Sequence, residues 1–156
     1  MSPTEISRFR DEYDFLSNFY PCNITYDGLK YGSVEVAFQA AKCSDTTERQ
    51  KFTSLNPGYA KKLGKEIELR NDWESVKKSV MWELLVIKFI NNPTLMKKLI
   101  ETGDTRLIEG NSWHDNYWGD CECLKCKDVK GQNVLGELLM QIRKRQLQLL
   151  KQYITL

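Results

Sequence analysis

The chain has 156 residues, of which 41% are hydrophobic and 28% charged, and its formal net charge is +2 at pH 7. This balance is typical of a globular protein and excludes a disordered chain, while the near-neutral charge excludes a broad electrostatic surface for nucleic acid or lipid. There is no apolar run of the roughly 18 residues that a spanning helix needs and no apolar core of a signal peptide. Five cysteines, an odd number, fit a reducing compartment. We therefore expect a single domain over residues 1–156 in the cytoplasm, with no membrane partner.

The first third of the chain predicts short strands and short helices. In NITYDGLKYGS, β-forming residues flank Asp27 and Gly28, a strong signal for a hairpin turn. Ser33 stands where a helix N-cap belongs, so we predict a helix over SVEVAFQAAK, residues 33–42. Two short helices follow in DTTERQKFTSL and PGYAKKLGKE, and Pro57 opens the second.

Longer helices are predicted in the second half. Asp72 suits an N-cap for a helix over residues 72–92, whose apolar residues recur at helical spacing: Trp73, Val76, Val80, Leu84 and Ile87. Pro93 ends this helix and opens another, which Gly103 closes.

The last helix begins near Asn133 and runs to the end of the chain. We expect its buried face to consist of Leu135, Leu138, Leu139, Ile142, Leu149 and Tyr153. Residues 104–131 show no sustained period and predict a long loop, of the kind that often carries function. The expected fold class is therefore mainly α (α+β), a compact single-domain helical fold with a small N-terminal β-hairpin.

The helix over residues 33–42 carries a polar stripe. It is apolar on most sides, as a buried helix is, yet Glu35, Gln39 and Lys42 fall at i, i+4 and i+7 on one face. Buried charges are costly unless they are paired or face a cleft, so the stripe either faces solvent or lines a site. In a site, Glu35 could act as a base or stabilise a developing cation. A desolvated Lys42 could act as a nucleophile or an acid.

Three further stretches hold candidate binding residues. Asn18 and Phe19 in SNFY could grip a planar ring, or could form a turn and a core anchor. In YWGD, Trp118 could stack on a base and Asp120 offers a carboxylate, although a loop tryptophan can equally fill the core. Asn133 in GQN opens the last helix, whose amides could hold a phosphate, and simple capping is the alternative.

A cysteine-rich stretch is the candidate metal site. CECLKC places Cys121, Cys123 and Cys126 within six residues, and three thiols can surround a zinc ion with His114 as a fourth ligand. The spacing is not that of a doubled CxxC, so free thiols in a loop are the alternative. If zinc binds, we expect a structural role for it rather than a catalytic one, and no other cofactor is required.

Six motifs in order resemble the YbiA-like, or NADAR, family. They span roughly residues 15–145 and read FLSNFYP, SVEVAFQAAKC, LRNDWESVKKSVMWELLVIKF, TGDTRLIE, YWGD and GQNVLGELLMQIR. The resemblance implies a small, mainly helical, YbiA-like fold and an enzyme that acts on N-glycosidic bonds. Its substrate would be a phosphoribosylamino-pyrimidine intermediate of riboflavin synthesis or ADP-ribose attached to guanine in nucleic acid.

The resemblance also implies roles for particular residues. Those implied in catalysis are Glu35, Lys42 and Asp120, and those implied in substrate binding are Asn18, Phe19, Gln39, Arg70, Trp118 and Asn133. Glu35 would stabilise an oxocarbenium-like state or activate water, while Lys42 would protonate the leaving nitrogen or attack a ring-opened sugar. Val36 stands where many members carry His, so a mechanism that needs that histidine does not carry over.

The implied partner is a small nucleotide-like molecule, with ADP-ribosylated nucleic acid as a second candidate. Two other classes of function stay open on the sequence. A non-catalytic module could bind ADP-ribose or a related nucleotide without turnover, and a zinc-stabilised interaction protein could be built on CECLKC. Release of free base would separate a hydrolase from a binding module, and metal analysis would test the third reading.

Overall fold

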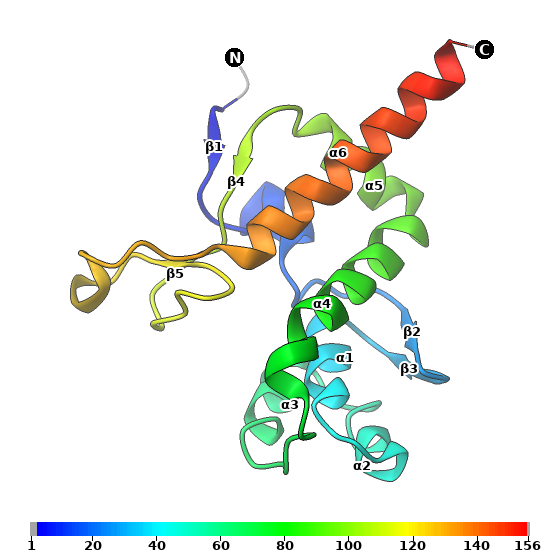
Figure 1. The fold of residues 1–156 in the computed structure, drawn as a ribbon, viewed down its shortest axis with the longest axis vertical. Coiled ribbons are helices and arrows are strands. Elements are labelled where there is room, and N and C mark those ends of the chain that lie inside the picture. The colour runs from blue at the N-terminus through cyan, green and yellow to red at the C-terminus, as the bar shows by residue number, and fades with distance from the viewer. Residues whose placement is uncertain (1–2, 156) are drawn as a thin grey trace. The chain divides into compact units, whose positions relative to one another are not determined.

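The computed structural model describes residues 3–155 and is dominated by helices (Figure 1). In that range there are six α-helices, two 3-10 helices and three two-stranded sheets, which confirms the predicted mainly α fold class. No helix within these residues is both long and apolar enough to cross a membrane. The chain divides into two compact units: unit 2 is Asn18–Asn91, and unit 1 combines the segment that ends at Ser17 with the chain from Asn92 onward. The single domain over 1–156 stays a prediction.

Unit 2 consists of a hairpin and four α-helices. In chain order these are β2 (Ile24–Tyr26), β3 (Leu29–Tyr31), α1 (Val34–Ala41), α2 (Thr46–Gln50), α3 (Pro57–Leu63) and α4 (Trp73–Ile90). β2 and β3 pair antiparallel and lie side by side in Figure 1. Asp27 and Gly28 form the turn with φ of 47° and 80°, the positive values that a two-residue type I′ turn requires. The hairpin is therefore confirmed.

Local hydrogen bonds determine where two helices of unit 2 begin. Ser33 Oγ accepts a hydrogen bond of 3.2 Å from the amide of Val36, so the predicted cap of α1 is confirmed. Asn56 Oδ1 accepts a bond of 2.9 Å from the amide of Tyr59, and Pro57 opens α3 as predicted.

Asp72 lies at the N-cap position of α4, but its carboxylate does not cap the helix. Its two oxygens instead accept hydrogen bonds of 2.6 and 2.9 Å from the Arg70 guanidinium. The predicted helix start is therefore right and the predicted capping bond is wrong, because a charged donor two residues away competes successfully for the carboxylate.

Helix α1 forms the centre of unit 2. All eight of its residues are buried, and it packs against α2, α3, α4 and both strands of the hairpin. Phe38 of α1 meets Trp73 of α4 with 5.0 Å between ring centroids. The fully buried side chains of this unit include Ile24, Phe52, Leu84, Leu85 and Phe89.

Unit 1 contains short parallel strands and the longest helix. Its elements are β1 (Glu5–Ile6), η1 (Asp11–Leu16), α5 (Pro93–Glu101), β4 (Arg106–Leu107), β5 (Gly110–Asn111), β6 (Asp120–Cys121), η2 (Leu124–Cys126) and α6 (Val134–Ile154). β1 pairs with β4 and β5 pairs with β6, each in parallel. Residues 104–131, predicted as a loop, thus contain three strands and a 3-10 turn. Strands of two residues have no measurable period, so the sequence pattern could not predict them.

The buried face of α6 is shorter than predicted. Its first half is buried as expected, through Leu135, Leu138, Leu139 and Ile142. The prediction is wrong for Leu149 and Tyr153, whose exposed fractions are 48% and 79%. Helix α6 has 21 residues and its neighbour α5 has nine, so at 1.5 Å per residue α5 is too short to cover both halves.

The start of α6 depends on the side chain of Asn133. This residue has φ of 51°, in the left-handed region that asparagine tolerates. Its side chain makes no capping bond, so the predicted capping is wrong. Its Nδ2 donates to the carbonyl oxygen of Leu107 (2.8 Å), and its Oδ1 accepts from the amide of Glu109 (2.9 Å). One buried amide therefore satisfies two backbone groups beside β4.

We predict that Asn133→Asp lowers the free energy of unfolding by about 2–4 kcal/mol. The substitution preserves shape and tolerance of positive φ, but it replaces the donor to Leu107 with a charged acceptor that faces a carbonyl oxygen. Chemical denaturation at pH 7 measures the change. Gln132→Glu, at the exposed neighbouring position, is the matched control and should change stability by less than about 0.5 kcal/mol. Equal stability of the two variants would contradict this role of Asn133.

Candidate functional site

Glu35 and Gln39 form a buried polar pair on one face of α1. Their exposed fractions are 8% and 5%, and Gln39 Nε2 donates a hydrogen bond of 2.8 Å to Glu35 Oε1. The alternative in which the stripe faces solvent is therefore wrong for these two residues. A carboxyl group at this depth is costly to ionise, so its presence marks the pair as a candidate site.

Two side-chain amide oxygens, one in this pair and one next to it, have no hydrogen-bond partner among the described residues. They are Gln39 Oε1 and Asn18 Oδ1, both fully inaccessible to solvent. Asn18 is adjacent to α1, because its carbonyl oxygen accepts a bond of 2.9 Å from the Glu35 amide, and its Nδ2 lies 3.6 Å from the Met81 sulfur. Proteins rarely leave buried acceptors unsatisfied, so both oxygens are candidates to accept N–H groups of a ligand once a side-chain movement exposes them.

Gly64, directly after α3, makes space for the Gln39 amide. A Cβ at position 64 would overlap Gln39 Oε1 and lie 2.8 Å from Gln39 Cδ. The sequence analysis missed this residue, because a glycine that ends a helix is ordinary. Only its contact with α1 distinguishes it.

Lys42 follows α1 and is half-buried. Burial lowers the pKa of its ammonium from the usual 10.5, the charge of Glu35 opposes this change, and Lys61 and Lys65 lower the pKa further. The Nζ of Lys42 lies 5.9 Å from the centroid of the Phe38 ring. The pKa of Lys42 therefore depends on Glu35 and on two lysines that the sequence analysis did not identify.

Phe19 and Arg70 are the remaining predicted site residues of unit 2. Phe19 is 43% exposed, so its reading as a core anchor is wrong, and the Nζ of Lys61 lies 5.9 Å from its ring centroid. The Arg70 amide donates a bond of 2.8 Å to the carbonyl oxygen of Lys42, which holds Arg70 beside the end of α1. Its guanidinium is engaged by Asp72, as described above.

A fully buried cation of unit 2 was also missed. Lys88 of α4 has no exposed surface, and its Nζ lies 5.5 and 5.3 Å from the ring centroids of Tyr20 and Phe89. Burial raises the pKa of the Cys22 thiol, and the charge of Lys88 opposes this rise. A sequence signal existed, since Lys88 falls four residues after Leu84 on the apolar face of α4.

The other predicted site residues lie in unit 1. Asp120 of β6 accepts a hydrogen bond of 2.9 Å from the amide of Gly131. The amide of Trp118 donates to Asp115 Oδ1 (2.9 Å), which holds the YWGD segment in a tight turn. The buried side chain of Asn133 makes hydrogen bonds to the backbone of Leu107 and Glu109. The catalytic role of Asp120 and the substrate-binding roles of Trp118 and Asn133 stay predictions.

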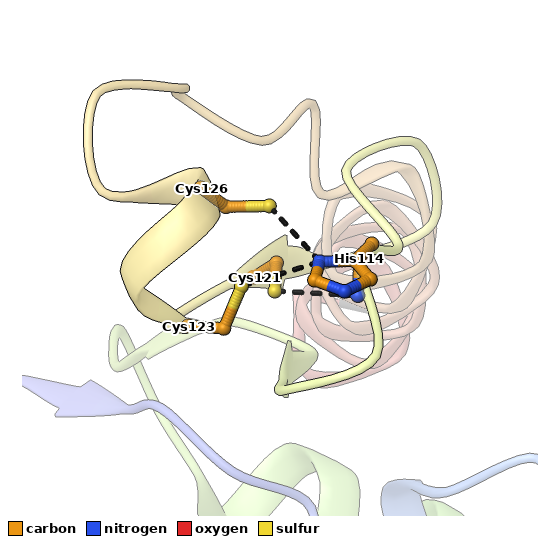
Figure 2. Close-up of side chains that lie close together, drawn as sticks. All are labelled: His114, Cys121, Cys123 and Cys126. Carbon is orange, nitrogen blue, oxygen red and sulfur yellow. Dashed lines mark hydrogen bonds between the residues drawn. The ribbon is translucent and has the colours of Figure 1, made fainter.

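His114 precedes the YWGD segment and three cysteines follow it, and their side chains meet in one cluster (Figure 2). The ligand atoms of His114, Cys121, Cys123 and Cys126 all lie within 4.8 Å of one another. His114 Nδ1 is 3.2 Å from the sulfur of Cys123 and 3.5 Å from that of Cys126. The His114 amide donates a bond of 3.3 Å to the sulfur of Cys121. The four predicted residues thus form one cluster with a donor set that can hold a metal ion.

The thiols of this cluster differ in acidity. Desolvation raises the pKa of Cys123. Hydrogen bonds with the Cys121 thiol and with the thiol and backbone of Cys126 outweigh this desolvation and lower the pKa from 9.0 to about 7. Desolvation raises the pKa of Cys126, and its hydrogen bonds with the other two thiols raise it further. Ionisation of one thiol therefore disfavours ionisation of its neighbour.

Comparison with known proteins relates the chain to one family. A model of the NADAR domain matches residues 6–147. The chain is 36% identical over 136 residues to a riboflavin biosynthesis protein of Vibrio vulnificus, which covers 85% of this chain and 35% of that protein. It therefore spans about a third of that relative's length.

A second relative is similar over most of both chains. The N-glycosidase YbiA of Escherichia coli K12 is 36% identical over 138 residues, which cover 86% of this chain and 82% of YbiA. The NMR structure of E. coli YbiA matches with a TM-score of 0.81 and 35% identity, over 97% of this chain and 89% of that one. The predicted YbiA-like fold is confirmed.

We predict opposite shifts of the Lys42 pKa in two variants. Glu35→Gln removes a negative charge that raises this pKa and should lower it further, whereas Lys61→Gln removes a positive charge and should raise it. The pH dependence of Lys42 acylation, followed by mass spectrometry of the peptide, measures both. The exposed Lys62 is the internal control. Shifts in the same direction would contradict this account of the charges around α1.

Proposed function

Because the chain belongs to the NADAR domain family and is an N-glycosidase, we propose that it hydrolyses the C–N bond between a ribosyl group and the base of a nucleotide-like substrate. The observation that carries this proposal is the buried Glu35–Gln39 pair with the pKa-lowered Lys42 beside it. Water supplies a hydroxyl to the anomeric carbon, and the base leaves with a proton. The reaction therefore consumes no cofactor.

Glu35 is proposed to stabilise the sugar. Departure of the base leaves positive charge on the ribosyl ring, as in glycoside hydrolysis generally. A carboxylate stabilises such charge more strongly when water is excluded, and Glu35 is 8% exposed. The hydrogen bond from Gln39 fixes the orientation of the carboxylate before the reaction. The same group could instead activate the attacking water.

Lys42 is proposed to supply the proton of the leaving base. Burial and the neighbouring lysines lower the pKa of its ammonium, so it releases a proton more readily than an exposed lysine does. The neutral amine could alternatively attack C1 of the ring-opened substrate, where it would displace the amino group of the base and form an imine with the sugar that water then hydrolyses. Reduction with borohydride would trap that imine as a stable adduct on Lys42, and no adduct is expected if Lys42 acts only as an acid.

The substrate class is proposed from the polar groups around this pair. Gln39 Oε1 and Asn18 Oδ1 are acceptors without a partner in the described structure, and the amino groups of a pyrimidine intermediate or of guanine would supply N–H donors. The exposed ring of Phe19 could stack on a base. Lys61 and Lys65 supply positive charge for phosphate, and Arg70 could exchange Asp72 for a phosphate oxygen.

Two substrates match these features. A phosphoribosylamino-pyrimidine is favoured by the relative named for riboflavin biosynthesis, and ADP-ribose attached to guanine is the second candidate, which the family resemblance implies. We also propose a cytoplasmic location, supported by the five cysteines, all of which are free.

We predict that Glu35→Gln and Lys42→Ala each lower turnover by about 100-fold or more. The matched controls Glu66→Gln and Lys62→Ala change exposed residues of the same unit and should retain full activity. Free base released from the pyrimidine intermediates and from ADP-ribosylated guanine DNA is measured by mass spectrometry, with thermal unfolding as a check of the fold. Full activity in both site variants would refute the assignment. Calorimetric binding of ADP-ribose without any base release would support the non-catalytic module instead.

A further prediction concerns the space at Gly64. Gly64→Ala should displace the Gln39 amide and raise KM about 10-fold or more, equivalent to about 1.4 kcal/mol of lost binding. The fold should survive, because the main group displaced is the end of a flexible side chain, and the Ala60 carbonyl oxygen at 3.2 Å needs only a small shift. Gly58→Ala is the matched control in α3, since its Cβ would meet only Asn56 Oδ1 at an ordinary 3.5 Å. An unchanged KM for Gly64→Ala would argue against a contact between Gln39 and the substrate.

A further inference from the structure

We propose that His114, Cys121, Cys123 and Cys126 bind one structural zinc ion, and that this ion holds the segment between them in its folded form. These four residues are separate from the Glu35–Lys42 machinery and are assigned no step in the reaction. Zinc binding itself does not depend on the proposed function. Only its consequence for activity, through Trp118 and Asp120, rests on that function.

The spacing of the ligand atoms matches a tetrahedral zinc centre. With bonds of about 2.3 Å to sulfur and 2.0–2.1 Å to nitrogen, a tetrahedron separates sulfur atoms by about 3.8 Å and nitrogen from sulfur by about 3.6 Å. The distances from His114 Nδ1 to Cys123 and Cys126 are 3.2 and 3.5 Å, and all ligand atoms fall within 4.8 Å. An ion could therefore enter if the most distant ligand atoms moved together by up to about 1 Å.

The chemistry of the donors favours zinc in a closed site. Three thiolates and one imidazole are soft ligands that suit zinc and exclude magnesium and calcium. Four protein ligands complete the tetrahedron, so no position remains for water or substrate, as in structural zinc sites. The backbone supports the same arrangement, because the His114 amide donates to the sulfur of Cys121 and the Asn116 side chain accepts from the Cys121 amide.

The segment around the cluster has little regular secondary structure and is held mainly by hydrogen bonds between side chains and backbone. Its strands β5 and β6 have two residues each, and η2 has three, too few for independent stability. His114 has φ of 71°, a left-handed conformation that must be maintained by its surroundings. An ion that joins His114 to Cys121 would close the loop that contains Trp118 and Asp120. Through the bound ion, the cysteines would hold the YWGD segment in its observed conformation.

Metal analysis of the full chain tests the proposal. After dialysis against metal-free buffer, we expect inductively coupled plasma mass spectrometry to find about one zinc ion per chain. Cys123→Ser and Cys126→Ser should lose it, while Cys22→Ser, which alters a half-buried thiol outside the cluster, should retain it. Removal of zinc by a chelator should lower the thermal midpoint, and added zinc should restore it. Cobalt bound in its place should show the absorption of a tetrahedral thiolate complex.

Several results would overturn the proposal. These are a folded wild-type chain that holds no zinc and takes up none, iron in place of zinc, disulfides among the three cysteines, or zinc retained by the Cys123→Ser Cys126→Ser double variant. If the variants do not fold, zinc released from the wild type by a thiol-modifying mercurial still decides the question. Zinc-replete protein that releases no base from either substrate would refute the proposed function and leave the metal site standing.

Discussion

Helix α1 is buried on every side, and the arrangement of unit 2 depends on this burial. A helix of eight residues is not stable in water by itself, so its conformation must come from packing against α2, α3, α4 and the hairpin. The same packing carries Glu35 and Gln39 into the interior. Their hydrogen bond offsets part of the desolvation, but an apolar pair would cost less. A polar pair at this depth is the kind of local conflict that proteins keep at functional sites.

The charges near α1 suit the proposed reaction. In the resting protein the carboxylate of Glu35 stabilises the ammonium of Lys42, against the effects of burial, Lys61 and Lys65. In the proposed reaction, the proton of Lys42 would pass to the leaving base, and the carboxylate would lose that cation just as positive charge develops on the ribosyl ring. One buried negative charge would then stabilise Lys42 in the ground state and the sugar in the transition state. The effect of this charge is strengthened because the burial of α1 keeps bulk water away from the Glu35 carboxylate.

Unit 1 is held together differently. Its strands are only two residues long, and the segment before α6 is held mainly by bonds between side chains and backbone. Asn133 joins the start of α6 to the backbone beside β4, Asp115 holds the amide of Trp118, and Asp120 holds Gly131. Such bonds specify one conformation but contribute only about 1 kcal/mol each. The removal of one buried partner should nevertheless have a larger effect there, because the group left unpaired stays desolvated.

The sequence by itself determined the local features. Asp27-Gly28 predicted the hairpin, Ser33 the start of α1, Pro57 and Pro93 the starts of α3 and α5, and CECLKC with His114 the cysteine cluster. These signals act within a few residues, through φ preferences, capping bonds and ligand spacing. The tertiary structure alone decided that Glu35 and Gln39 face inward and that Gly64 makes space for Gln39. It also decided that Lys61 and Lys65 lower the pKa of Lys42, and that the Asn133 side chain bonds to the backbone at β4 rather than capping its own helix. Burial and charge depend on segments distant in the chain, and no spacing within one helix contains that information.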